Sequence, residues 1–73
     1  MTESRPPPRN EAVALAYTSG EAAPRVVAKG KGVVAIRIRQ IAAVHGVPIV
    51  EKPPLARALY YNVDVGREVS PQF

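Results

Sequence analysis

The chain has 73 residues, with ten Lys and Arg against six Asp and Glu, a formal net charge of +4 and no cysteine. This length suits one small domain with little interior for a large cofactor, so a binding module is favoured over an enzyme. The lack of cysteine excludes disulfides, thiolate metal sites and a cysteine nucleophile. No apolar run reaches the roughly 18 residues that span a bilayer, because Arg37 and Arg39 interrupt the longest one. We therefore expect a cytoplasmic protein.

Two strands are predicted after a proline-rich start. Residues 1–10 (MTESRPPPRN) contain three consecutive prolines and predict a disordered arm, which leaves 11–73 as the folded domain. Residues 12–17 (AVALAY) form a short apolar run that predicts a strand. Residues 25–29 (RVVAK) contain paired β-branched side chains and predict a second strand, which Gly30 and Gly32 are expected to end.

A helix is predicted from Val33 to His45, where the apolar period changes. The apolar residues that share one face of this helix are Val34, Ile38, Ile41 and Ala42. Gly46 follows at the position where a left-handed residue ends a helix.

A third strand and a second helix complete the pattern. Residues 49–51 (IVE) predict a short buried strand, and Pro54 suits the first position of a helix that carries Leu55, Ala58 and Leu59 at helical spacing. Residues 69–73 predict a tail that packs one or two apolar side chains. The order β-β-α-β-α indicates an α/β (α+β) fold, with a small sheet of about three strands packed with two main helices. Such a sheet leaves an edge or a face uncovered, where another chain can dock.

The glycines and the histidine have ordinary structural interpretations. Gly30-Lys31-Gly32 precedes a helix, as phosphate-binding loops do, but its spacing differs from theirs, and a strand-to-helix turn is favoured. His45 is the only histidine, and a helix-end position is favoured over a metal or catalytic role. No catalytic, metal-binding or cofactor-binding residue is predicted.

Seven basic residues and one acid, Glu51, lie between positions 25 and 57. No aromatic residue lies within a basic run, so base stacking is unsupported and no nucleic-acid partner is expected. Lys29, Lys31 and Arg37 remain candidates for steering a protein partner. Glu51 is expected to form an ion pair with Arg57 or Lys29.

Three segments carry a resemblance to a known family: residues 12–17 (AVALAY), 23–32 (APRVVAKGKG) and 47–60 (VPIVEKPPLARALY). In order and spacing they resemble the cytoplasmic domain of the FlhB family, the switch component of the flagellar type III export apparatus, which includes the YscU and SpaS group. The similarity runs from about Ala12 to Phe73. It implies a non-enzymatic protein-binding module of that apparatus, without a cofactor.

The sequence departs from the family pattern before the first strand. Family members carry an Asn-Pro-Thr-His loop there and cleave themselves after its Asn, whereas this chain has Pro7-Pro8-Arg9-Asn10, and Asn10 precedes Glu11 rather than a proline. The resemblance therefore implies a relative without self-cleavage. The strand before that loop, the membrane-spanning region and the last helix of the family have no counterpart, so we expect a free-standing relative, cytoplasmic or peripheral at the inner face of the membrane.

The resemblance also implies contact residues. In the family the downstream part stays bound to the strand before the cleaved loop, so we expect a strand-docking edge that pairs with a membrane-bound FlhB-like protein or with a second copy of this chain. Its residues are Ala12, Val13, Ala14, Leu15, Ala16 and Tyr17. Ala23 and Pro24 match one part of the family's shallow apolar patch for export substrates, and the other part, in the last helix, is missing.

A structural role is expected for Leu55, Arg57, Leu59 and Tyr60, with Arg57 ordering the second helix against the sheet. The alternative function is a small basic domain unrelated to export that binds nucleic acid or an acidic protein.

Overall fold

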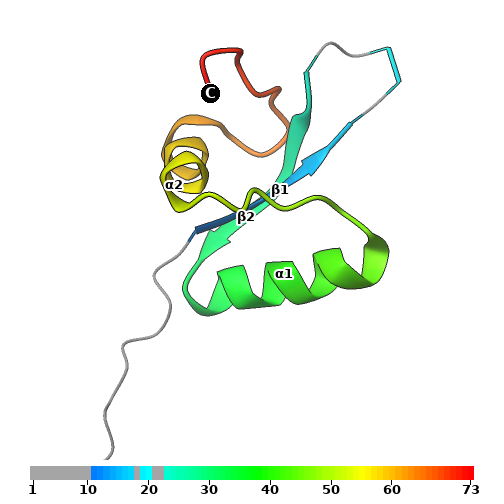
Figure 1. The fold of residues 1–73 in the computed structure, drawn as a ribbon, viewed down its shortest axis with the longest axis vertical. Coiled ribbons are helices and arrows are strands. Elements are labelled where there is room, and N and C mark those ends of the chain that lie inside the picture. Colours follow the sequence, from blue (N-terminus) through cyan, green and yellow to red (C-terminus); the bar gives the residue numbers. More distant parts are fainter. Residues whose placement is uncertain (1–10, 18, 21–22) are drawn as a thin grey trace, which may run out of the picture.

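The computed structural model describes residues 11–17, 19–20 and 23–73, so the expected arm over residues 1–10 lies outside the described part. The elements are strands β1 (Glu11–Ala16) and β2 (Arg25–Lys31), followed by helices α1 (Val33–His45) and α2 (Pro53–Asn62). Figure 1 shows α1 on one side of the two strands and α2 on the other. The predicted α+β class with two helices is confirmed.

β1 is hydrogen-bonded along both of its edges. On one side it pairs antiparallel with β2, from Glu11↔Lys31 to Ala16↔Arg25, with an irregularity between Ala14 and Leu15. On the other side the Leu15 N–H donates to the Pro48 C=O at 3.0 Å, and the Val50 N–H donates to the Val13 C=O at 3.0 Å. β1 is therefore a central strand.

The expectation of a docking edge at residues 12–17 is therefore wrong. Besides the two bonds to Pro48 and Val50, the Glu11 C=O accepts a hydrogen bond from Arg39 Nη2 at 3.4 Å, so one backbone group of each outward-facing residue, Glu11, Val13 and Leu15, is engaged. Four residues of the predicted edge are buried, and only Tyr17, beyond the strand, is largely exposed; the buried ones are Ala12, Val13, Ala14 and Leu15. The segment from Pro48 to Val50 therefore occupies the side of β1 where an incoming backbone would have to pair.

The predicted third strand at residues 49–51 is present only as a single bridge between Ile49 and Ala14, and the named sheet has two strands. Pro48 has no N–H to continue a ladder, and Glu51 is exposed. Prolines at 53 and 54 then start α2 immediately. The segment therefore covers the edge of β1 without forming a regular strand.

β2 is longer than predicted, because Gly30 lies inside the strand and does not end it. A Cβ at this position would overlap Cγ1 of Val34 and lie 2.9 Å from Cδ1 of Ile38. Glycine is needed here because α1 approaches the strand closely.

α1 begins and ends as predicted, and Gly46 adopts the left-handed conformation with φ 69°. Its buried face differs from the prediction, however. Ala35 and Ala42 are the buried residues, whereas Val34 and Ile41 are 56% and 53% exposed. Small side chains face the sheet, which lets the helix pack closely, and the larger ones are displaced to the flank.

α2 packs its apolar side against the other face of the sheet. Val13, Leu15 and Val26 form the core with two residues from α2 and its C-terminal end, Leu59 and Val63. The predicted tail packs as expected, since Val69 and Phe73 lie against this cluster. No described helix is long and apolar enough to cross a membrane.

Leu59 is expected to be indispensable for folding, because its side chain is 1% exposed at the centre of the core. Leu59→Ala should lower the free energy of unfolding by about 2–5 kcal/mol, measured by urea denaturation. Val44→Ala is the control, since Val44 is 80% exposed, and its effect should stay within about 0.5 kcal/mol. Equal effects of the two changes would contradict the placement of the core.

A proline at Ala14 is expected to unfold the domain. Val13 directs its C=O away from β2, so Ala14 directs its N–H towards β2, where it pairs with Ala28. Ala14→Pro removes this donor from a central strand, and far-UV circular dichroism should show loss of structure. Ala14→Gly keeps the donor and should remain folded. A folded Ala14→Pro variant would show that β1 is not central.

Candidate functional site

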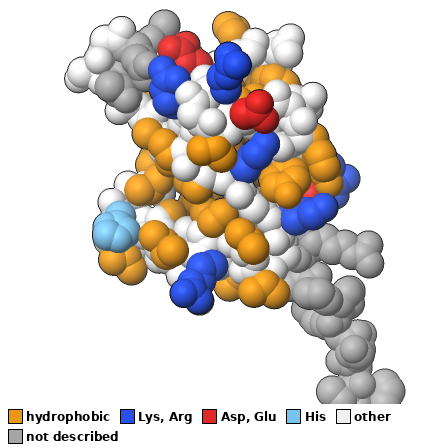
Figure 2. All heavy atoms as spheres, turned by 180° about the vertical axis from the view of Figure 1, so that it is seen from behind, with side chains coloured by type: hydrophobic (Ala, Val, Ile, Leu, Met, Phe, Trp, Pro, Cys, Tyr) orange, Lys and Arg blue, Asp and Glu red, His pale blue; other side chains and the backbone are white. Residues whose placement is uncertain are grey.

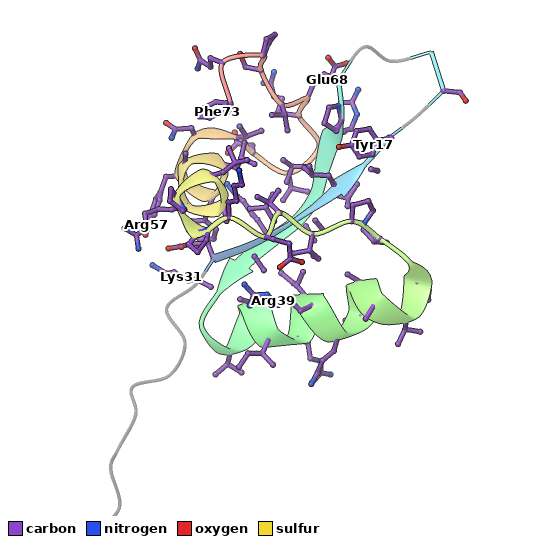
Figure 3. The ribbon with its side chains drawn as sticks, in the orientation of Figure 1. Tyr17, Lys31, Arg39, Arg57, Glu68 and Phe73 are labelled. Atoms are coloured by element: carbon purple, nitrogen blue, oxygen red, sulfur yellow. The ribbon has the colours of Figure 1, made fainter. Side chains whose placement is uncertain are left out.

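An apolar groove lies where the end of β1, the start of β2, α2 and the C-terminal tail meet. Its volume is about 350 Å³, and its lining includes Ala23, Pro24, Leu55, Val69 and Phe73. Figure 3 shows Tyr17 at the end of β1 and Phe73 beside α2. Tyr17 also lines the groove and is 70% exposed. The groove therefore has an apolar floor, an aromatic residue at its rim and an opening to solvent.

The C-terminal tail forms one wall of this groove. The Val69 N–H donates to the Pro24 C=O at 2.8 Å, which joins the tail to the segment before β2. Val69, Pro71 and Phe73 then line the groove opposite Ala23 and Pro24. The sequence signal for this wall was the set of apolar residues in the tail. Sequence analysis predicted that they pack, but did not relate them to Ala23 and Pro24.

The three predicted partner-steering cations do not form one surface. Lys29 Nζ donates to the C=O groups of Tyr60 at 2.7 Å and Val63 at 2.9 Å, so it satisfies carbonyls at the C-terminal end of α2. Lys31 Nζ lies 5.8 Å from the ring centres of Tyr60 and Tyr61. Arg37 is exposed on α1, which packs on the other face of the sheet. Lys29 therefore has a local structural role.

An acidic residue that sequence analysis missed lies beneath Arg57. The Arg57 Nε is 3.8 Å from Glu11 Oε1, and the Glu11 side chain is only 6% exposed. This pair links α2 to the first residue of β1, and Figure 3 shows Arg57 on the outer side of α2. The expected pairing of Glu51 with Arg57 or Lys29 is wrong, because the carboxylate beside Arg57 is Glu11 and the one beside Lys29 is Asp64. The other predicted structural residues, Leu55, Leu59 and Tyr60, all belong to or pack against the core.

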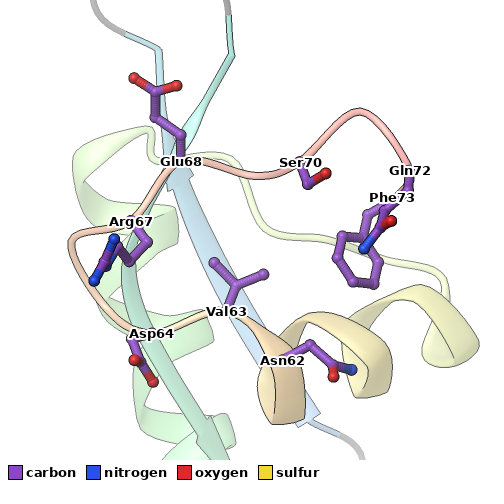
Figure 4. A pocket seen from close by; sticks show the side chains of 8 residues that line it. All are labelled: Asn62, Val63, Asp64, Arg67, Glu68, Ser70, Gln72 and Phe73. Carbon is purple, nitrogen blue, oxygen red and sulfur yellow. The ribbon is translucent and has the colours of Figure 1, made fainter.

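A second, polar cavity of about 420 Å³ lies between the C-terminal end of α2 and the tail. Its charged lining residues are Asp64, Arg67 and Glu68, whose side chains point away from one another (Figure 4). Within the described part of the chain, no three His, Cys, Asp or Glu side chains gather into a possible metal site. The apolar groove is therefore the candidate site that matches the predicted contact residues.

Comparison with known proteins places this chain in a family. The pattern of the FlhB HrpN YscU SpaS family matches residues 7–73. The chain is 50% identical over 66 residues to the flagellar biosynthetic protein FlhB of Salmonella typhimurium, covering 89% of this chain and 17% of that protein. For FlhB of Aquifex aeolicus the identity is 52% over 67 residues, covering 90% and 19%. The chain thus spans less than a fifth of the length of these curated relatives.

The solved structures that it resembles are C-terminal domains. A substituted form of the EscU C-terminal domain matches with a TM-score of 0.76 and 34% identity, over 90% of this chain and 81% of that one. The PscU C-terminal domain matches with a TM-score of 0.76 and 32% identity, over 89% and 84%. This chain therefore belongs to the FlhB HrpN YscU SpaS family and has the fold of its C-terminal domain.

Proposed function

We propose that this chain is a non-enzymatic protein-binding module of the flagellar type III export apparatus. Its relatives are named as flagellar biosynthetic proteins, which supports a role in flagellar assembly. The observation that carries the proposal is the apolar groove, because the Ala-Pro pair that matches the family's substrate-contact patch lines it. The partner that we propose is an apolar segment of an exported flagellar protein.

The groove suits a short apolar segment. Leu59 is buried at its floor, whereas Leu55, Val69 and Phe73 are half-buried and offer apolar surface to a ligand. Burying such surface contributes about 25 cal/mol per Å², so a shallow groove supports weak and reversible binding. Weak binding fits an export role, because each substrate must leave before the next one arrives.

The groove is tested by placing a charge in its wall. Ala23→Asp puts a carboxylate into an apolar lining and should reduce retention of purified flagellar hook protein on the immobilised chain by about tenfold or more. Ala43→Asp, the same change on the exposed side of α1, is the matched control and should bind as the original chain does. In the source bacterium, deletion of the gene should alter motility or hook length, and the Ala43→Asp form, but not the Ala23→Asp form, should restore both. Normal motility and hook length after deletion would contradict the export role.

We further propose that the chain does not cleave itself. The cleavage that the family resemblance implies requires an Asn followed by Pro, and Asn10 is followed by Glu11. Residue 10 lies outside the described residues, so this proposal depends on the sequence.

Intact-mass spectrometry of the purified chain tests this second point. The mass should remain that of residues 1–73 during prolonged incubation at neutral pH. The matched variant carries Pro7→Asn, Arg9→Thr and Asn10→His, which places Asn-Pro-Thr-His directly before Glu11 and reports whether the folded domain supports the reaction. Fragmentation of the original chain beside Asn10 would contradict the proposal.

A further inference from the structure

Among the described residues, the outer edge of β2 is hydrogen-bonded only near its start. The Val26 N–H donates to the Arg67 C=O at 2.9 Å, and the Gly66 N–H donates to the Val26 C=O at 2.7 Å. Within the described residues, the backbone bonds across this edge stop at Val26. The segment with Gly66 and Arg67 therefore covers the start of β2, and the part of the strand after Val26 lies beyond it.

Two backbone positions in this part of the strand face away from β1. In an antiparallel ladder, paired residues either bond to each other or both direct their N–H and C=O outwards. Val13 and Glu11 give their C=O groups to Val50 and Arg39, so their partners across the ladder, Lys29 and Lys31, also face outwards. An open stretch of this kind is a template for another extended backbone.

An apolar stripe borders this edge on the α1 side. It consists of Val27, Val34, Ile38 and Ile41, and three of its members are between 44% and 56% exposed. Beside it, between α1 and the sheet, is a cavity of about 190 Å³ lined only by apolar residues, among them Val27, Ile38 and Ile41. Figure 2 shows hydrophobic side chains gathered over this side of the molecule. Apolar surface next to an open strand edge marks an interaction site.

On the sheet face that packs against α2, the same part of β2 carries basic side chains. Lys31 is exposed, and the contacts of its ammonium within the described residues are with the rings of Tyr60 and Tyr61, without a carboxylate. Lys29, two residues earlier and on the same side, lies 4.0 Å from Asp64. Lys31 is therefore the charge available to a ligand at this edge.

We propose that the outer edge of β2, from Val27 to Lys31, binds an extended segment of another protein in which apolar and acidic residues alternate. Successive side chains of a strand point to opposite faces, so such a segment directs its apolar residues to the stripe and its acidic residues to Lys31. A helix would cover the stripe but leave the outward N–H and C=O groups of β2 unpaired. A second copy of this chain is disfavoured by the +4 charge that each copy carries. This site is separate from the apolar groove and does not depend on the export proposal.

The test uses a fluorescein-labelled, end-capped peptide of alternating Val and Glu, with fluorescence anisotropy for affinity and amide exchange for location. We expect binding, with slower exchange of the Lys29 and Lys31 amides. The same peptide with N-methyl groups on alternate residues, prepared in both registers, cannot form the ladder in one of them. One methylated peptide should fail to bind. Equal binding of all three peptides, or protection confined to the groove residues Leu55 to Leu59, would overturn the proposal.

Three variants locate the contacts. Lys31→Glu should weaken binding of the Val-Glu peptide by about two- to fivefold, as expected for an exposed ion pair, and strengthen binding of a Val-Lys peptide. Ile41→Asp should weaken binding through the stripe. Val44→Asp is its matched control, on a more exposed part of the same helix, and should leave affinity unchanged. Loss of affinity in Val44→Asp equal to that in Ile41→Asp, with both variants folded by circular dichroism, would exclude the stripe as the contact.

Discussion

The position of β1 between two backbone neighbours is the constraint on which the rest of the structure depends. β2 lies on one side of this strand, and the segment from Pro48 to Val50 lies on the other. Because a hydrogen-bonded neighbour lies along each edge, β1 contacts the two helices through its faces. Ala12 and Ala14 are directed to the α1 face, whereas Val13 and Leu15 contribute to the core under α2. The difference in side-chain size explains why α1 packs closely against the sheet while α2 covers a core of larger residues.

The two proposed binding sites lie at the margins of the sheet. The groove beside Ala23 and Pro24 is completed by the C-terminal tail, and the outer edge of β2 is left open beyond Val26. These two surfaces lie at opposite ends of β2, so the two proposed binding sites are separate. The family membership supports the role proposed for the groove, whereas the role proposed for the edge follows from hydrogen bonding and charge.

Several basic side chains form stabilising contacts within the domain. Lys29 satisfies carbonyls at the end of α2, Arg39 bonds to the C=O of Glu11, and Arg57 lies beside the Glu11 carboxylate. A cation near a helix C-terminus or a buried carboxylate stabilises local structure. The net charge therefore overstates the charge that a partner meets, and Lys31 is the cation beside the open edge without a carboxylate neighbour in the described part of the chain.

The sequence by itself determined those features whose causes are local. The period of the apolar residues from Val33 and the glycine at 46 were enough to place both ends of α1, and the prolines placed the start of α2 within one residue. The resemblance in three segments was enough to identify the family. Only the tertiary structure decided which edge was free, which side of α1 was buried and which acid paired with Arg57. Each of these depends on a residue distant in sequence: Pro48 and Val50 cover β1, Gly30 admits Val34 and Ile38, and Glu11 reaches α2. Periodicity and turn signals describe neighbours along the chain, whereas strand order and ion pairing are set by contacts that form only when the chain has folded.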